Sequence, residues 1–207
     1  MTQSLFAYWN GLRGARSAPE RSCIDPSAIR DILAHTFILE VDAAASFPFR
    51  LAGTRVSALF GADLKAMKYA SLFTWPGGEP DREGAALPLL VCDDMSPVVA
   101  GIDATTRSGR EVGLELLLLP LRHHGKTHSR VLGCLTPCAM PVWYGLDPLE
   151  SLFMRSCRVV LPAEIGAERA SLRRVGTPER PDAVRRKHLF VYQGGQSQPE
   201  GVLSSRG

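Results

Sequence analysis

The chain has 207 residues, of which 45% are hydrophobic and 22% are charged, and its formal net charge is +3 at pH 7. This apolar content is sufficient to bury the core of one globular domain with extensions. The net charge is too small to indicate nucleic-acid binding by itself, although the basic excess lies near the C-terminus. We therefore expect one folded domain and no nucleic-acid partner.

The cysteines and the apolar runs indicate the compartment. The five cysteines are odd in number and widely spread, which is typical of reduced thiols rather than of a disulfide framework. No cationic leader precedes an apolar segment, and the most apolar run, Leu114–Leu121, is far shorter than the roughly 20 residues that span a bilayer. We expect a cytoplasmic protein without membrane insertion. The cysteines are Cys23, Cys92, Cys134, Cys138 and Cys157.

The N-terminal region predicts two helices. Apolar residues at helical spacing predict an amphipathic helix over residues 4–13, which needs a partner surface. The composition of Arg13–Arg21 is that of a linker. Asp25 followed by Pro26 predicts the start of a second helix that runs to about His35. The apolar residues of the first helix are Leu5, Tyr8, Trp9 and Leu12.

Five segments have the length and composition of strands. Two of them flank a turn at Ser108–Arg110, which predicts a long antiparallel hairpin. A polar turn over His123–His128 leads into the last strand. The predicted strands are Phe37–Val41, Phe47–Leu51, Val98–Arg107, Glu111–Leu119 and Ser129–Thr136.

Short helices are predicted between the second and third strands. The apolar spacing is helical from Thr54 and continues in single turns to Phe73, and a further helix is predicted over residues 82–94. Gly53 and Gly61 suit positions that need a positive φ or a close backbone approach. The element order predicts an α+β fold in which a five-stranded antiparallel sheet carries short helices on one face, with a pocket between the layers.

This order resembles the PAS fold, in which the second strand is followed by a helix that ends at a glycine. Further residues are similar to those of a family of alphaproteobacterial single-domain PAS proteins, whose members are regulator-like and largely uncharacterised. The resemblance implies a PAS-like domain over residues 25–161, after an N-terminal helix and linker (1–24) and before a basic extension (162–207). The matching positions are Trp9, Leu12–Gly14, Arg16, Pro19, Arg21, Pro26, Ile29, Leu132–Gly133, Thr136–Pro137, Trp143–Pro148 and the element from His188 to Gly195.

The resemblance also sets expectations for cofactors. Haem-binding relatives place a histidine in the helical layer, and relatives with covalent flavin place a cysteine there. The segment Thr54–Leu90 contains neither residue type, so we expect neither haem nor covalent flavin. Two alternatives are left for the interior, namely a noncovalent small ligand and plain core packing. We expect Tyr69 and Trp75 to be packing residues rather than a surface on which a planar ligand stacks. The expected lining of the pocket is Leu59, Phe60, Leu64, Leu72, Leu89, Leu90, Ile102 and Leu114.

No motif indicates metal binding or catalysis. A cluster of histidines and cysteines lacks the paired spacing of a closed zinc site, so we expect no metal. Motifs for a nucleophile, a metalloprotease or a phosphate loop are missing, and Asp93–Asp94 is better explained as a helix end than as an acid/base pair. We expect no enzyme activity. The cluster comprises His123, His124, His128, Cys134 and Cys138.

The leading hypothesis is a non-catalytic PAS sensory or regulatory protein that acts through protein contacts, with itself as a homodimer and with a separate signalling protein. Leu5, Tyr8, Trp9, Leu12 and an exposed sheet face are the expected contact surfaces. The alternatives are a small-ligand sensor, a ligand-free structural adaptor, and a nucleotide or nucleic-acid binder. The last would use the basic tail, namely Arg169, Arg173, Arg174, Arg180, Arg185, Arg186 and Lys187. Arg169 and Arg173 are spaced like the arginine pair of cyclic di-GMP receptors, but the companion motif is missing.

Overall fold

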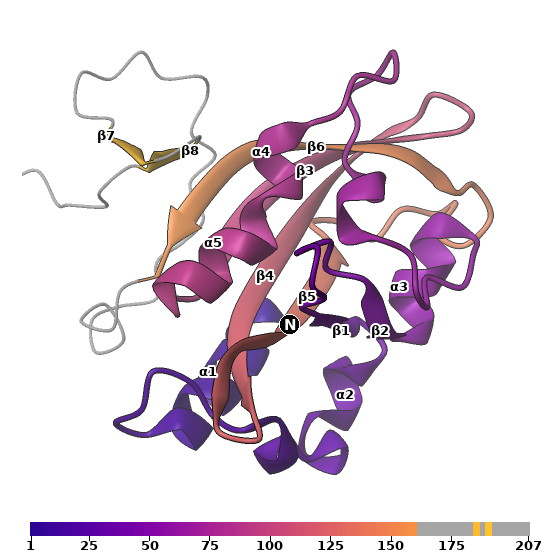
Figure 1. Cartoon of the computed structure of the whole chain (residues 1–207). Coiled ribbons are helices and arrows are strands. Elements are labelled where there is room, and N and C mark those ends of the chain that lie inside the picture. The colour runs from indigo at the N-terminus through magenta and orange to yellow at the C-terminus, as the bar shows by residue number, and fades with distance from the viewer. Residues whose placement is uncertain (161–183, 187–188, 192–207) are drawn as a thin grey trace, which may run out of the picture. The chain divides into compact units, whose positions relative to one another are not determined.

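A computed structural model describes residues 1–160, 184–186 and 189–191 (Figure 1). Residues 1–160 belong to one compact unit, and a second unit contains the paired strands β7 (Val184–Arg186) and β8 (Leu189–Val191). Most of the predicted basic tail, including Arg169 and Arg173, lies outside the described residues. The same holds for most of the element from His188 to Gly195.

The first unit is built on an antiparallel sheet of six strands in the order β2-β1-β5-β4-β3-β6. The predicted α+β class is therefore confirmed, with one strand more than predicted. The additional strand, β6, pairs with β3 and forms an edge of the sheet. The strands are β1 (Thr36–Glu40), β2 (Phe49–Ala52), β3 (Val98–Thr106), β4 (Glu111–His123), β5 (Lys126–Pro137) and β6 (Leu149–Val159).

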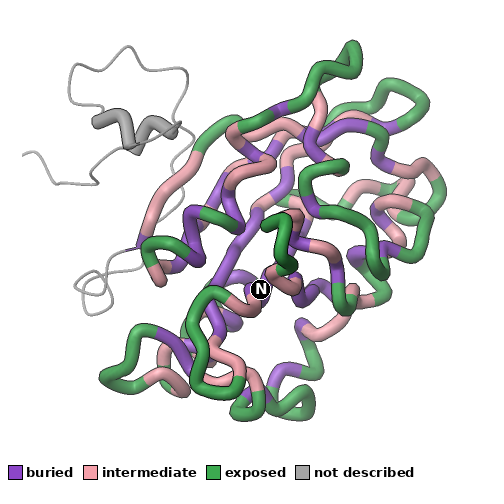
Figure 2. Tube along the Cα trace, in the orientation of Figure 1, coloured by how far each residue is buried: buried purple, intermediate pink, exposed green. Residues whose placement is uncertain are grey.

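Strand β4 is buried on both faces of the sheet. Its residues Leu116–Leu121 are all buried, as the continuous purple segment in the centre of Figure 2 shows. Side chains of successive strand residues point to opposite faces, so a continuous buried run requires a covering layer on each side. Leu116 packs toward one layer, where it lines the core cavity, and Leu117 belongs to the hydrophobic cluster of the other.

The first covering layer consists of short helices. They are α3 (Thr54–Phe60), η3 (Tyr69–Leu72), α4 (Arg82–Ala85) and α5 (Leu87–Asp94). The single helix predicted over residues 82–94 is thus two helices. The carboxylate of Asp81 caps α4, and Pro88 lies in the first turn of α5, where the missing N–H of proline costs no helical hydrogen bond.

The two glycines that flank α3 have different roles. Gly61 ends the helix with a left-handed backbone, φ 60°, and its N–H bonds to the carbonyl of Ser57. Gly53 has an extended backbone, but a Cβ atom at this position would lie 2.4 Å from the carbonyl oxygen of Ala34. Gly53 therefore permits a close backbone approach, and Gly61 permits a positive φ.

The N-terminal segment forms the second covering layer. Leu5 and Trp9 of α1 are 0% and 1% exposed, and they pack with Leu117, Leu119 and Leu132 of the sheet. This layer also contains η1 (Arg21–Cys23), η2 (Pro26–Ile29) and α2 (Arg30–Leu33), and α1 spans Thr2–Arg13. The partner surface that the amphipathic helix requires is thus provided by its own chain.

A hydrogen bond fixes α1 on the sheet. The indole Nε1 of Trp9 donates to the carbonyl oxygen of Pro120 at 2.9 Å, in a buried position. Strand β3 pairs with β4 only as far as Leu118, so this carbonyl lies beyond that ladder. Proline is tolerated there because no neighbouring strand requires its N–H. The bond satisfies a buried indole and a buried carbonyl together.

These contacts correct the prediction of an exposed sheet face. The N-terminal layer covers that face over β1, β4 and β5, because Ile38, Leu117 and Leu132 all belong to its cluster. The helix α1 belongs to the same compact unit as the sheet. Within the described residues, no helix is long and apolar enough to cross a bilayer.

We expect Trp9→Ala to lower the free energy of unfolding by about 3–5 kcal/mol, because it removes a fully buried ring and leaves the Pro120 carbonyl unpaired. Urea denaturation would measure this, with Gln3→Ala on the exposed side of α1 as the control. A loss below about 0.5 kcal/mol, equal to that of the control, would show that α1 is not docked on the sheet.

Candidate functional site

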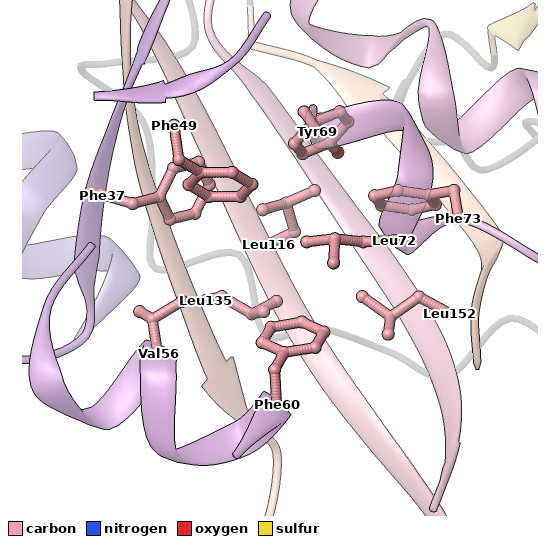
Figure 3. A pocket seen from close by; sticks show the side chains of 10 residues that line it. All are labelled: Phe37, Phe49, Val56, Phe60, Tyr69, Leu72, Phe73, Leu116, Leu135 and Leu152. Atoms are coloured by element: carbon pink, nitrogen blue, oxygen red, sulfur yellow. The ribbon is translucent and has the colours of Figure 1, made fainter. Parts of the chain in front are cut away.

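A small cavity lies between the sheet and the helical layer (Figure 3). Its volume is about 10 Å³, which is close to the space for a single water molecule, whereas pockets for drug-sized ligands measure roughly 300 Å³ or more. The surface of the cavity is apolar, and among the lining residues only Tyr69 has a polar side-chain group. The lining residues are Phe37, Phe49, Val56, Phe60, Tyr69, Leu72, Phe73, Leu116, Leu135 and Leu152.

Aromatic side chains fill most of this space. The ring centroids of Phe37 and Phe49 are 5.3 Å apart, those of Phe49 and Tyr69 are 6.4 Å apart, and those of Tyr69 and Phe73 are 4.9 Å apart. The four rings form a continuous row across the helix-facing side of the sheet (Figure 3). Tilted pairs at these separations contribute about 0.5–1.5 kcal/mol each beyond area burial. The row therefore stabilises the filled state of the interior.

The sheet has a specific place for the first ring of this row. Phe37 of β1 pairs with Gly133 of β5, and a Cβ atom at Gly133 would lie 2.0 Å from the Phe37 ring. The ring thus lies over the bare backbone of the glycine. Gly133 is one of the positions in the PAS resemblance, and the contact gives a physical reason for glycine there.

Tyr69 carries the polar atom of the lining. Its side chain is 2% exposed, and its hydroxyl has no hydrogen-bond partner within the described residues. Burial raises the pKa of this hydroxyl well above its usual range, and the nearby Cys157 and Asp81 raise it further. The group is therefore a neutral phenol. A buried hydroxyl without a partner costs about 1–3 kcal/mol relative to a paired one.

The carboxylate of Asp81 is buried close to this tyrosine but is fully engaged. One oxygen accepts from the backbone N–H groups of Glu83 and Gly84, both at 3.2 Å, and the other accepts from the N–H of Met154 at 2.7 Å. These bonds join α4 to the edge strand β6. Asp81 is thus a structural cap in which both carboxylate oxygens accept backbone hydrogen bonds.

The residues of the predicted lining occupy different places in the structure. Phe60 and Leu72 line the cavity, and both are half-buried, while every other lining residue is buried. Leu89 does not line it, because its position on the outer side of α5 leaves it 42% exposed. The remaining predicted residues are buried in the core but do not line this cavity: Leu59, Leu64, Leu90, Ile102 and Leu114.

Most of the residues that do line the cavity were missed. The sequence could have indicated Leu116 as a lining residue, because it lies two residues from Leu114 and so shares its face of the strand. The indication for Phe37 and Phe49 was weaker and consisted only of their position in predicted strands. Leu152 had none, because β6 was not predicted.

The histidines and cysteines do not converge. His123 and His124 lie together at the β4–β5 turn with ring centroids 4.1 Å apart, whereas Cys134 is buried under the N-terminal layer. Within residues 1–160 and the described parts of the tail, no three His, Cys, Asp or Glu side chains form a group able to hold a metal ion. Burial raises the pKa values of Cys92, Cys134 and Cys157 to about 12, so these thiols are poor nucleophiles.

One series of side chains has the order of a nucleophile, a base and an acid. The Nδ1 atom of His128 lies 3.1 Å from the hydroxyl of Thr127, and its Nε2 atom lies 3.9 Å from the carboxylate of Asp93. The His128 side chain is 49% exposed, and these residues line neither the core cavity nor a groove formed by Trp9, Arg13, Ser17, Asp94, Met95, Ser96, Pro97 and Val160. An exposed series without a substrate pocket does not meet the geometry of nucleophilic catalysis.

A second buried polar group, His35, lies between the end of α2 and the start of β1. His35 is 5% exposed, and its Nδ1 atom has no hydrogen-bond partner within the described residues. Burial lowers the pKa of His35, and the positive charge of Arg55 lowers it further. The imidazole is therefore neutral near pH 7, and its role is structural.

Tyr69→Phe tests whether the hydroxyl is unpartnered in solution. Because the change removes a buried polar group without altering the ring, we expect the free energy of unfolding to stay the same or to rise by up to about 1 kcal/mol in urea denaturation. Tyr69→Ala is the control for the ring, with an expected loss of about 3–5 kcal/mol. A loss above about 1 kcal/mol for Tyr69→Phe would show that the hydroxyl has a partner, such as a bound ligand.

Comparisons with known proteins place the chain in a family. No curated protein matches its sequence. Similar solved structures include the light state of the blue-light photoreceptor Aureochrome1 LOV, at 13% identity over 57% of this chain and 91% of that chain, with a TM-score of 0.41. A structure of a Light-Oxygen-Voltage domain with a flavin analogue has 14% identity over 56% and 87% of the two chains, with a TM-score of 0.41. An RNA-binding Light-Oxygen-Voltage receptor has 18% identity over 57% of this chain and 35% of that chain, with a TM-score of 0.41.

A sequence profile of the PAS domain matches residues 1–136, which include both covering layers and the strands through most of β5. The chain therefore belongs to the PAS domain family and has a PAS-type α+β fold.

Proposed function

We propose that this chain is a non-catalytic sensory or regulatory PAS protein that acts through contacts with other proteins. The observation that carries the proposal is the filled interior, in which the aromatic row leaves a cavity of about 10 Å³. When the interior of a domain is occupied by its own side chains, the domain receives and transmits a signal through its outer surface. PAS domains are generally sensory rather than catalytic, which supports the same role.

Flavin does not fit the interior in this arrangement. Several hundred Å³ would be needed for a ligand of that size, and the lining offers only the Tyr69 hydroxyl for hydrogen bonding. No Asn, Gln, Ser or Thr side chain is present among the lining residues to recognise a polar ring edge. The interior of this chain therefore does not accommodate flavin.

A smaller ligand could act only by displacing side chains. Phe60 of α3 and Leu72 of η3 are the half-buried members of the lining, so they are the lining side chains that solvent reaches. Movement of Phe60 would shift α3, which contacts the loop that joins β5 and β6 through Tyr144 and Arg55. Ligand modulation is thus compatible with the fold, as a secondary part of the proposal.

The proposed homodimer needs a revised surface. Leu5 and Trp9 are buried against their own sheet, so a second chain would reach them only if α1 left the sheet. Tyr8 and Leu12 keep partly exposed side chains on the same helix. These two residues are the part of the predicted helix interface that a docked α1 can present.

Native mass spectrometry of the protein purified from its own cells tests the proposal. We expect a chain with no bound small molecule that carries a stoichiometric protein partner, either a second copy or another protein. A monomer that carries a mass of a few hundred daltons would contradict the proposal, because it would show that the interior opens for a ligand and that the chain is primarily a ligand sensor.

A further inference from the structure

The end of α2 and the start of β1 form a tight turn that other parts of the chain hold in place. The hydroxyl of Thr36 donates to the carbonyl oxygen of Leu33 at 2.8 Å. The backbone N–H of Leu135 on β5 donates to the carbonyl oxygen of His35 at 3.0 Å, which attaches the turn to the sheet. We call residues Leu33–Thr36 the joint.

The N-terminal end of α3 is attached to the same joint. The backbone N–H groups of Arg55 and Val56 donate to the carbonyl oxygen of Ala34 at 2.9 and 3.2 Å, and that of Gly53 donates to the carbonyl oxygen of Thr36 at 2.8 Å. The first N–H groups of a helix have no partner within the helix, so the joint supplies the acceptors that α3 needs. The close packing of Gly53 against Ala34 leaves no space between the two segments. A displacement of the joint therefore moves the start of α3.

The joint encloses the imidazole of His35 without satisfying both of its nitrogens. The residue is 5% exposed, and its Nδ1 atom has no hydrogen-bond partner within the described residues. A protonated imidazole carries a hydrogen on each nitrogen, so Nδ1 would become a buried charged donor without an acceptor. Protonation is therefore unfavourable for as long as the ring stays in the joint.

The charges that act on His35 oppose its protonation as well. Burial is the largest cause of its lowered pKa, and the guanidinium of Arg55 on α3 is the next. The amino group of Met1 lowers the pKa further, and a hydrogen bond with the backbone of Leu135 opposes these effects without cancelling them. The pKa of His35 in the folded chain is thus below its ordinary value of 6.5.

The other charged residues of the elements around the joint do not balance a positive charge there. Arg30 and Asp31 of α2 form an exposed ion pair at 3.7 Å. Glu40 of β1 pairs with Arg130 of β5 at 2.9 Å, and the charged residue of β2, Arg50, is itself positive. Both carboxylates therefore already have a cationic partner.

We propose that His35 is an acid-sensitive switch: when its ring takes up a proton, the ring leaves the joint and the hydrogen bonds between the joint and α3 open. The carbonyl oxygen of Arg55 accepts from the hydroxyl of Tyr144 at 2.6 Å, so a displaced α3 also releases the loop between β5 and β6. The buried imidazole thereby couples pH to the arrangement of a surface loop. This switch is a property of the fold and does not depend on the proposed protein partner.

The switch operates on the acid side of neutral pH. Because the pKa of His35 is lower in the folded chain than in the unfolded chain, the unfolded chain binds more protons as the pH falls. The stability that the neutral ring contributes is therefore complete above about pH 6.5 and is lost as the pH falls below that value. While the folded chain keeps the ring neutral, this residue alone raises the unfolding constant by up to about fivefold between pH 6.5 and pH 5.5.

Urea denaturation of the full chain at pH 7.5, 6.5 and 5.5 tests the proposal. We expect the unfolding constant of His35→Gln to rise less on acidification than that of the unchanged chain, by up to about fivefold between pH 6.5 and pH 5.5. Only changes with pH are compared, so a constant loss of stability in the variant does not matter. His124→Gln, at an exposed position of the β4–β5 turn, is the control and should keep the acid sensitivity of the unchanged chain. Arg55→Gln leaves the ring in place and removes its positive neighbour, so its acid sensitivity should be intermediate.

Hydrogen exchange at two pH values shows whether the joint opens locally. After correction for intrinsic rates, the amides of Gly53, Arg55 and Val56 should exchange faster relative to those of β4 at pH 5.5 than at pH 7.5, because their acceptors belong to the joint. In His35→Gln this ratio should not change with pH. Two results would overturn the proposal: an equal acid sensitivity of the unchanged chain and His35→Gln, or a ratio of exchange rates in the unchanged chain that is the same at both pH values.

Discussion

The structure depends on the burial of β4 from both sides. Leu116 and Leu118 face the helical layer, while Leu117 and Leu119 face the N-terminal layer, so neither layer can leave without exposing a row of leucines. The bond from Trp9 to Pro120 ties the second layer to the same strand. The N-terminal segment is therefore part of the folded core, which agrees with the match of the PAS profile from residue 1.

The same sheet determines what the interior can do. Gly133 admits the ring of Phe37, the aromatic row continues from it to Phe73, and the remaining space is close to that of one water molecule. The Tyr69 hydroxyl is the unusual feature, because native cores seldom leave a buried hydroxyl without a partner. Because the interior is filled, the outer surface is the part of this domain that a partner can reach.

Local patterns predicted the elements whose signals lie within a few residues of one another. The Asp25 cap, the helix end at Gly61 and the turn at Ser108–Arg110 are all of this kind. Strand β6 was missed because it is an edge strand whose polar residues, such as Arg155 and Arg158, hide its alternation.

The candidate site was harder to predict than the elements. Its contacts join residues distant in sequence, such as Phe37 and Gly133. Such contacts produce no periodic pattern of apolar residues in the local sequence. Leu89 was placed in the cavity together with Leu90, but it lies two residues from the buried Leu87 on α5, which is about 200° around the helix axis, and so it faces away from the core. An amphipathic stripe likewise shows that α1 needs a surface but does not show which one.

Hydrogen exchange of the full chain, followed by mass spectrometry, tests the role of the N-terminal layer most directly. If α1 is part of the core, the amides of residues 5–13 will be protected to the same order as those of β4, because both open only when the whole unit unfolds. Exchange of α1 that is orders of magnitude faster than that of β4 would contradict this view. It would mean that the helix leaves the sheet while the rest of the domain stays folded, and that Leu5 and Trp9 become available to a partner.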